Sequence, residues 1–308
     1  MTFHELAALS DEEARRYFIR TRWPKGPDCP HCGGHKCKEL HGKAHRAGLF
    51  KCYQCRKQFS ATVGTIFHSS HISIKKWLLA LHLMCASKKG ISALQLQRAL
   101  DLKSYKSAWF MCHRLRHAMQ EEPMKALLSG SVEVDETYVG GKPRKGTGIV
   151  NKRGRGTKKT PVLVLVERDD RAVSKPIERI TAKELKGTIK ELVSDEATIF
   201  TDELSSYTGI GRYFAGGHHV VKHSAGEYAR GKNYEIHSNT AESFFSLLKR
   251  GINGAYHHVS KKHLFRYCAE FDFRWNTRKE SDSDRTTIAM RKTIGKRLTY
   301  KTPTSNVA

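Results

Sequence analysis

Three acidic residues that are far apart in the sequence are the first candidates for chemistry. Asp135 lies in the segment SVEVDETYV, Asp202 lies in ATIFTDELSSY, and Glu242 lies in EIHSNTAESFFSLLKRG. Carboxylates from two strands and a helix start could hold two divalent ions, Mg²⁺ or Mn²⁺, for phosphoryl chemistry. By residue type alone, four other acids compete for this role, namely Glu133, Glu136, Asp195 and Glu203.

The strand pattern around Asp135 has a consequence for its side chain. Alternation in SVEVDETYV places Val132 and Val134 on one face, and Glu133, Asp135 and Thr137 on the other. An acid that points inward from a strand costs free energy unless a cation or hydrogen bonds satisfy it. Asp202 is expected at the end of a second strand, where the ligand sites of open α/β sheets gather.

Glu242 has two possible explanations. From about Thr240 the sequence predicts an amphipathic helix, with one face formed by Phe244, Leu247 and Leu248 and the other by Glu242, Phe245, Ser246 and Lys249. As a structural residue, Glu242 would form a capping box with Asn239 as N-cap. As a chemical residue it would face the metal ions. The two roles are compatible, because Asn239 can cap the helix while Glu242 points to the ions.

Two cysteine pairs predict a zinc site. CPHC contains Cys29 and Cys32, and CYQC contains Cys52 and Cys55, so two tight turns can present four thiolates to one tetrahedral Zn²⁺. In a segment poor in aliphatic residues, the metal would replace a hydrophobic core. Nearby side chains that could substitute as ligands are His31, His35, Cys37, His41 and His45. The remaining cysteines lie on apolar helical faces and are expected in the core: Cys85, Cys112 and Cys268.

The charge balance points to a polyanionic partner. The 308 residues include 55 Lys and Arg but only 30 Asp and Glu, a formal net charge of +25. Such a surplus favours DNA or RNA as the partner. A membrane is the rival polyanion, but no apolar run reaches spanning length and the first residues do not resemble a secretion signal. A soluble cytoplasmic protein is therefore expected, with cysteines used for metal binding and packing rather than disulfides.

Hydrophobic periodicity divides the chain into parts. Strand-like runs cover residues 131–139, 161–167, 172–180, 197–203 and 218–223, with helical patterns at 181–193, around Glu242 and at 260–276. This order predicts an α/β domain. The expected parts are an N-terminal helix (1–27), a zinc ribbon (28–62), a helical segment (70–122), the α/β domain (128–280) with a basic loop (140–159), and a poorly ordered basic tail (281–308).

Two of these parts carry candidate DNA contacts. The helical segment predicts three helices with breaks at Lys88–Gly90 and Asp101–Ser104, which suits either a helix-turn-helix or an ordinary helical linker with a solvated basic face. In the first case, Arg114 and Arg116 on the third helix would contact DNA. The glycine-rich loop has no acid, and its expected phosphate contacts are Lys142, Arg144, Lys145, Lys152, Arg153 and Arg155, with Lys249 and Arg250 on the later helix.

Taken in order, these motifs resemble a known family. VEVDETYVGGK, FTDELSSY and HSNTAESFFSLLKRGINGAYHHVSKKHLFRYCAEFDFRWNTR, behind CPHC…CYQCRKQFSATVGTIF, are similar to the ISXO-type group of bacterial insertion-sequence transposases from about residue 15 to 280. The resemblance implies a DDE transposase with a ribonuclease-H-like catalytic core, in which the first and fourth strands are neighbours. It implies the triad Asp135, Asp202 and Glu242, with Lys249 as the basic residue two helical turns after the glutamate.

The same resemblance implies the partners. A DDE transposase binds double-stranded DNA at terminal inverted repeats and acts as a homodimer or higher oligomer, here expected in association with a bacterial nucleoid. Two alternatives remain open. A transposase-derived regulator would bind DNA without cutting it, and a ribonuclease-H-like nuclease or resolvase would cut without strand transfer.

Overall fold

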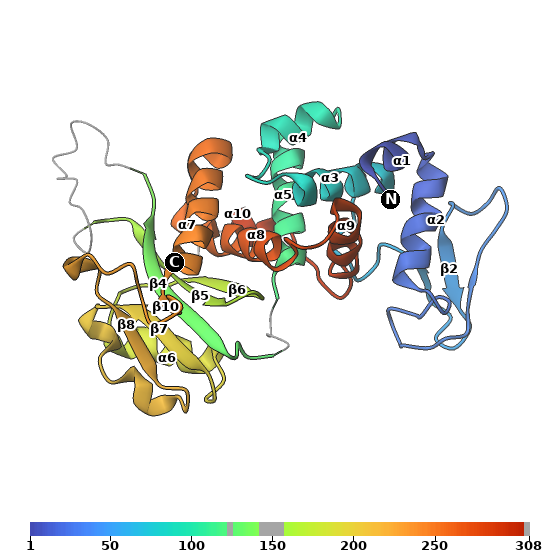
Figure 1. Ribbon diagram of the computed structural model, residues 1–308. Coiled ribbons are helices and arrows are strands. Elements are labelled where there is room, and N and C mark those ends of the chain that lie inside the picture. Colours follow the sequence, from blue (N-terminus) through green and yellow to red (C-terminus); the bar gives the residue numbers. More distant parts are fainter. Residues whose placement is uncertain (122–125, 142–156, 305–308) are drawn as a thin grey trace. The chain divides into compact units, whose positions relative to one another are not determined.

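The computed structural model describes residues 1–121, 126–141 and 157–304. The chain forms two compact units, one made of residues 1–119 with the chain from residue 279 onward, and one made of residues 120–278 (Figure 1). The first unit is mainly helical with a small sheet, and the second is α/β. In the part of the chain that the structure describes, no helix is long and apolar enough to cross a membrane.

Two capped helices open the N-terminal unit. In α1 (Phe3–Ala8) the capping box joins Thr2 and Glu5, and in α2 (Asp11–Arg22) it joins Ser10 and Glu13. The sequence predicts one helix within residues 1–27, so the structure adds a second. A three-stranded antiparallel sheet follows, with strands β1 (Cys37–Glu39), β2 (Leu49–Cys52) and β3 (Gln58–Ser60) in that order.

Three helices form where the periodicity predicts them. They are α3 (Ile74–Ala86), α4 (Ala93–Ala99) and α5 (Tyr105–Met119), and Ser73 and Ser92 cap the first two by accepting hydrogen bonds from main-chain N–H groups. Cys85 and Cys112 are buried, as their apolar faces predict.

The end of the chain corrects one expectation. Residues 282–291 form helix α9 (Asp282–Arg291), and a short helix α10 (Lys301–Thr304) follows. Ser281 caps α9, and its residues Thr286, Ala289 and Met290 are buried where the helix packs against α3. The expectation of a poorly ordered tail is therefore wrong for these residues, because three buried side chains at helical spacing give the basic segment a place in the N-terminal unit.

All five predicted strands form one sheet in the second unit. They are β4 (Ser131–Val139), β5 (Thr160–Glu167), β6 (Ala172–Pro176), β7 (Thr198–Asp202) and β8 (His218–Val221), in the order β6-β5-β4-β7-β8. The β6-β5-β4 half is antiparallel, whereas β7 runs parallel to β4 and β8 runs parallel to β7. The first and fourth strands of the sheet are thus neighbours.

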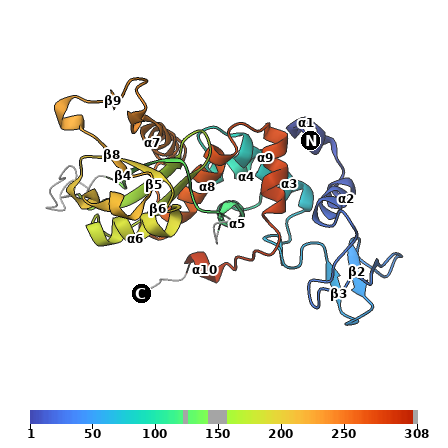
Figure 2. The ribbon, with the colours of Figure 1, turned by 60° about the horizontal axis from the view of Figure 1, so that its bottom comes forward.

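Helices cover both faces of this sheet. Helix α6 (Ala182–Leu192) packs on the face that carries Val132 and Val134, while α7 (Asn239–Gly251) and α8 (Leu264–Asn276) pack on the other (Figures 1 and 2). The strand β5 is buried on both sides, as its unbroken apolar run requires. Cys268 of α8 lies in the second of these cores, as predicted.

Short elements complete the second unit. A two-stranded hairpin, β9 (Ala229–Arg230) and β10 (Ile236–His237), leads directly into α7. The edge strand β6 is bonded to α8, because Asp272 accepts hydrogen bonds from Ser174 and Asn276 exchanges two with the main chain of Ala172. The remaining helical turns are Ser205–Tyr207, Ile210–Tyr213, His223–Ala225, Ile252–Tyr256 and Lys261–His263.

Candidate active site and zinc centre

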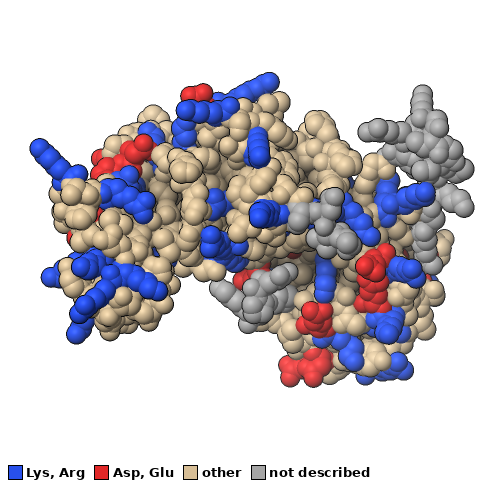
Figure 3. Space-filling view, turned by 180° about the vertical axis from the view of Figure 1, so that it is seen from behind, with Lys and Arg blue, Asp and Glu red and all other residues tan. Residues whose placement is uncertain are grey.

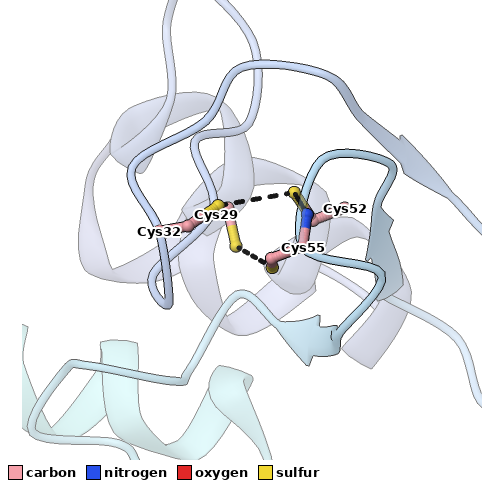
Figure 4. A group of neighbouring side chains, drawn as sticks. All are labelled: Cys29, Cys32, Cys52 and Cys55. Atoms are coloured by element: carbon pink, nitrogen blue, oxygen red, sulfur yellow. Dashed lines mark hydrogen bonds between the residues drawn. The ribbon is translucent and has the colours of Figure 1, made fainter.

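Four thiols gather between two turns of the N-terminal unit. Cys29 and Cys32 come from the turn before β1, and Cys52 and Cys55 come from the turn between β2 and β3 (Figure 4). All four Sγ atoms lie within 4.8 Å of one another, with 3.6 Å from Cys29 to Cys55 and 3.7 Å from Cys32 to Cys52. This donor set fits tetrahedral Zn²⁺, and the cluster supports the predicted zinc site.

The turn after β2 also favours the charged form of one thiol, that of Cys52. The main-chain N–H of Cys55 points to the Sγ of Cys52 at 3.5 Å, and this hydrogen bond is the largest cause that lowers the pKa of Cys52 to about 6. The other side chains that could substitute as ligands do not join the cluster within the described residues. Cys37 instead donates to the carbonyl of Gly34, and His35 contacts the carboxylate of Asp28 at 2.6 Å.

Aromatic side chains give the zinc ribbon a small core of its own. Trp23 from the end of α2 meets Phe50 edge-on, with ring centroids 5.4 Å apart, and Phe50 stacks on Phe59 at 5.6 Å. All three rings are buried. The sequence interpretation assigned the stability of this segment to the metal alone, and the structure adds the aromatic cluster.

The two aspartates lie at the same level of neighbouring strands. In the parallel ladder between β4 and β7, Glu133 pairs with Phe200. Asp135 and Asp202 each follow two residues later. Their side chains therefore lie at the same level and on the same face of the sheet. Asp202 is the last residue of β7, and its Oδ1 accepts a hydrogen bond from the N–H of Leu204 at 3.0 Å.

Nearby acids act on the carboxyl group of Asp135. Burial is the largest cause that raises the pKa of Asp135 to about 8, followed by the charge of Glu136 and, further, by those of Asp202 and Glu242. A cation bound among these acids would relieve this repulsion, and hard oxygen donors suit Mg²⁺ or Mn²⁺. The carboxylates are not gathered round one point, because the only tight group of three or more potential ligands among the described residues is that of the four cysteines.

The start of α7 overturns the capping explanation for Glu242. The N-cap is Ser238 rather than Asn239, and its side chain makes no capping hydrogen bond. Instead the main-chain N–H groups of Thr240 and Ala241 donate to Glu133 at 2.8 and 3.0 Å. The carboxylate of Glu242 is exposed and makes no hydrogen bond within the described residues. A second correction concerns Phe245, which is buried rather than on the polar face.

Glu133 has a role that the sequence does not reveal. It is fully buried in β4 and accepts hydrogen bonds from the Nε of Arg168 at 2.7 Å and the hydroxyl of Thr240 at 2.9 Å, with His237 Nδ1 at 3.1 Å. Arg168 also donates to the carbonyls of Glu235 and His237. Glu133 and Arg168 therefore fix the start of α7, and with it Glu242, against the strand that carries Asp135. The inward-pointing acid at 133 is a signal for this role, but nothing in the sequence marks Arg168.

The other competing acids are engaged elsewhere. Glu136 accepts a hydrogen bond from the hydroxyl of Tyr207 at 2.7 Å, and Glu203 accepts two from Ser224. Asp195 precedes β7, at the end of this strand opposite to Asp202. Glu133, Glu136 and Glu203 thus each have hydrogen-bond partners of their own, and Asp195 lies away from Asp202.

The structure describes only some of the basic residues that the sequence predicts as DNA contacts. Lys249 and Arg250 are exposed on α7, with the Lys249 Nζ 5.5 Å from the ring centroid of Phe245. Lys and Arg side chains are spread over both units on the face seen in Figure 3. The six loop residues Lys142, Arg144, Lys145, Lys152, Arg153 and Arg155 lie outside the described residues.

Arg114 and Arg116 do not fit their predicted role as DNA contacts. They are only 5% and 2% exposed. The guanidinium of Arg114 donates to the carbonyl of His68 and lies 5.4 Å from the ring centroid of Trp77, and burial lowers its pKa to about 10. The helical periodicity assigned these arginines to a solvated face, but the N-terminal unit folds over them.

Comparison with known proteins finds two matching family domains. An ISXO2-like transposase domain matches residues 127–276, and a transposase zinc-ribbon domain matches residues 9–58. The chain belongs to the ISXO-type transposase family. The family's transposase domain spans β4 to α8, and its ribbon domain begins before α2, earlier than residue 28, where the sequence interpretation begins the ribbon.

One relative matches most of this transposase-family chain. It is named "Uncharacterized protein in transposable element ISH50" and comes from Halobacterium salinarum. The two are 29% identical over 279 residues, which cover 86% of this chain and 91% of the relative. No solved structure matches.

Proposed function

We propose that this protein is the DNA transposase of an insertion sequence and that Asp135, Asp202 and Glu242 are its metal-binding DDE triad. One observation carries the proposal. The two aspartates lie level on adjacent parallel strands, and the charges of Asp202 and Glu242 both act on the half-buried carboxyl of Asp135. A protein that only binds DNA gains nothing from such a group of acids, since they repel phosphates.

The sheet supports a ribonuclease-H-like core for this reaction. Three antiparallel strands are extended by two parallel ones in the order β6-β5-β4-β7-β8, with helices on both faces. This order makes β4 and β7 neighbours, as the family resemblance implies. It brings together two residues that are 67 positions apart in the chain, 202 minus 135.

The three carboxylates would hold two divalent ions, preferably Mg²⁺ with Mn²⁺ as a substitute. When bound, the ions would activate the attacking water or 3′-OH and stabilise the leaving oxygen. The chain's own contribution is to hold the ligands. Asp135 must lose its proton, and the exposed Glu242 must turn toward the aspartates from an α7 that Glu133 holds in place. Lys249, two turns further along α7, would contact a phosphate of the DNA.

The remaining parts would bind DNA. The zinc ribbon and the helices α3 to α5 would recognise terminal inverted repeats, while Arg250 and the basic loop 140–159 would contact phosphates independently of sequence. Two protomers are expected to act on two element ends, so the working form would be a homodimer or larger. The protein would act on DNA in the cytoplasm.

The test is cleavage and joining of DNA that carries the element ends. With Mg²⁺, the purified protein should nick the ends and join the freed 3′-OH to target DNA. Asp135→Asn, Asp202→Asn and Glu242→Gln should each bind the ends as the wild type does in buffer without chelator and without added Mg²⁺. Each should cut about a hundredfold more slowly or worse, because a charge-neutralising ligand is lost.

A matched variant controls for loss of charge in general. Glu203→Gln removes an exposed acid next to Asp202 that, among the described residues, is bonded only to Ser224, and it should keep full activity. Binding without any cleavage by the wild type would favour a regulator, and cleavage without joining would favour a nuclease or resolvase. An active Glu242→Gln enzyme would remove Glu242 from the triad.

A further inference from the structure

The hairpin before α7 presents two exposed aromatic rings. Tyr228 is 70% exposed and Tyr234 is 71% exposed, the highest values for large hydrophobic side chains among the described residues; the next, Tyr53, is 54% exposed. Tyr228 directly precedes β9, and Tyr234 lies in the turn between β9 and β10. A single exposed ring needs no explanation, but two on one short hairpin form a surface.

The hairpin is anchored firmly at its base. Arg168 donates to the carbonyls of Glu235 at 2.6 Å and His237 at 2.9 Å, and Arg230 donates to the carbonyl of Val220 at 3.3 Å. In Figure 2 the segment with β9 extends away from the sheet. The rings are therefore carried by a projection whose base is tied to the core of the unit.

The turn itself holds an unusual backbone conformation. Tyr234 has φ of 57°, in the left-handed region that bulky residues rarely occupy. Gly231 has φ of 102°, and the carboxylate of Glu235 closes the turn by accepting a hydrogen bond from the N–H of Asn233 at 2.9 Å. Strained residues of this kind persist where the surrounding structure fixes them and are concentrated at functional positions.

The charges on the hairpin suit a polyanion. Lys222, Arg230 and Lys232 are exposed cations. The two acids are already engaged, because Glu227 pairs with Arg230 at 3.7 Å and Glu235 binds the turn. Lys222 and Lys232 thus remain to attract a phosphate backbone beside the two rings.

The hairpin lies next to the carboxylates. Strand β10 contacts β7, which ends at Asp202, and it leads within two residues into α7, which carries Glu242. If a phosphate of a DNA strand lay at the carboxylates, the neighbouring nucleotides of that strand would lie near the hairpin. Tyrosine rings stack on the flat faces of bases, but in a duplex those faces are covered by the adjacent base pairs.

We propose that Tyr228 and Tyr234 stack on unpaired DNA bases beside the cleavage site and so hold the end of the duplex open. This inference rests on the proposed function, since it takes DNA as the ligand. Each ring would add affinity for unpaired bases whatever their sequence, while the cations would add affinity for any DNA.

The experiment compares two DNA probes at physiological ionic strength, without chelator and without added Mg²⁺. One is a short duplex with a fully paired end, and the other is the same duplex with its last base pairs mismatched and one unpaired adenine replaced by 2-aminopurine. The wild type should prefer the mismatched probe and quench its fluorescence. Tyr228→Leu and Tyr234→Leu should each weaken binding to that probe about fivefold or more and leave the paired probe unchanged.

Three controls make the outcome decisive. Tyr228→Phe and Tyr234→Phe keep the ring and should keep both affinity and quenching, whereas Lys232→Gln should weaken both probes equally. Asp135→Asn should retain the preference for the mismatched probe, so a failure of the catalytic proposal leaves this test intact. The inference is overturned if the leucine variants bind both probes as the wild type does, lose both equally, or change only the oligomeric state.

Discussion

The two predicted metal sites are built in opposite ways. The four cysteines fall within residues 29–55, and their Sγ atoms already lie within 4.8 Å of one another. The three carboxylates extend from residue 135 to residue 242 and are brought near one another by a sheet and a helix start, but do not converge. The ribbon has little core besides three aromatic rings, whereas the α/β unit has a large core on each face of its sheet.

This difference distinguishes a metal that stabilises the fold of its segment from a metal that binds to a unit already folded without it. Zinc ligands close in sequence can organise a segment that cannot fold well alone. Carboxylates that are distant in sequence come together only after the chain has folded. Their mutual repulsion then destabilises the folded chain, and the raised pKa of Asp135 reflects this repulsion together with burial. Removing the metal should therefore damage the first site and leave the second folded.

The largest expected effect is on the ribbon. Structural zinc contributes about 10 kcal/mol or more to the folding of small zinc domains, so Cys52→Ser or strong chelation should unfold residues 28–62 and abolish specific end binding. Metal analysis should show one zinc per wild-type chain and none in the variant. Cys37→Ser, which lies outside the cluster, should keep its zinc. A Cys52→Ser protein with full zinc and a folded ribbon would contradict this prediction.

A smaller effect, on the free energy of unfolding, should distinguish Glu133 from Glu242, which are both candidate ligands by residue type. Glu133→Gln should lower the free energy of unfolding by about 3 kcal/mol or more, because it leaves the largely buried Arg168 without its charged partner and weakens the anchor of α7. Glu242→Gln should leave it almost unchanged, since this exposed carboxylate makes no hydrogen bond among the described residues. Denaturant unfolding of the two variants measures both, and equal stability losses would contradict the assignment of roles.

Much of this arrangement follows from local patterns. Strand-like runs predict all five strands, and the helix 181–193 is predicted by its periodicity to within one residue at each end. The cysteine spacing predicts the zinc ligands because two tight turns suffice to bring them together. The positions of Asp135 and Asp202 follow once their strands are placed side by side, which the family resemblance supplies.

The rest depends on contacts between distant residues. The cap of α7 comes from Glu133, 107 positions before Thr240, so the local pattern favours Asn239 instead. Arg114 and Arg116 lie off the apolar stripe of their helix, and only the folded unit shows that they are buried. Basic composition suggests disorder after residue 280, whereas Thr286, Ala289 and Met290 are buried against the N-terminal unit.

The smallest expected effect concerns how the stability of the protein depends on pH. Binding of Mg²⁺ should remove the part of this dependence that comes from the carboxylate site. The pKa of Asp135 is raised from an ordinary value near 4 to about 8 in the folded chain. Between these values the unfolded chain binds fewer protons than the folded one, so stability falls as pH rises through this window. A divalent ion binds the ionised carboxylate, lowers its pKa and removes this loss.

Asp272 provides an internal control for that measurement. Burial raises its pKa to about 8 as well, but it is bonded to Ser174 at the opposite edge of the sheet from β8, and no other acid contributes to its shift. Its share of the pH dependence should persist in Mg²⁺.

Melting temperatures of the wild type from pH 5 to pH 8 should fall by a few degrees more without Mg²⁺ than with it. In Asp135→Asn the two curves should coincide, because the group that couples protons to the metal is gone. If Mg²⁺ changed the slope of Asp135→Asn as much as that of the wild type, the ion would be bound elsewhere, and the contrast between the two metal sites would fail.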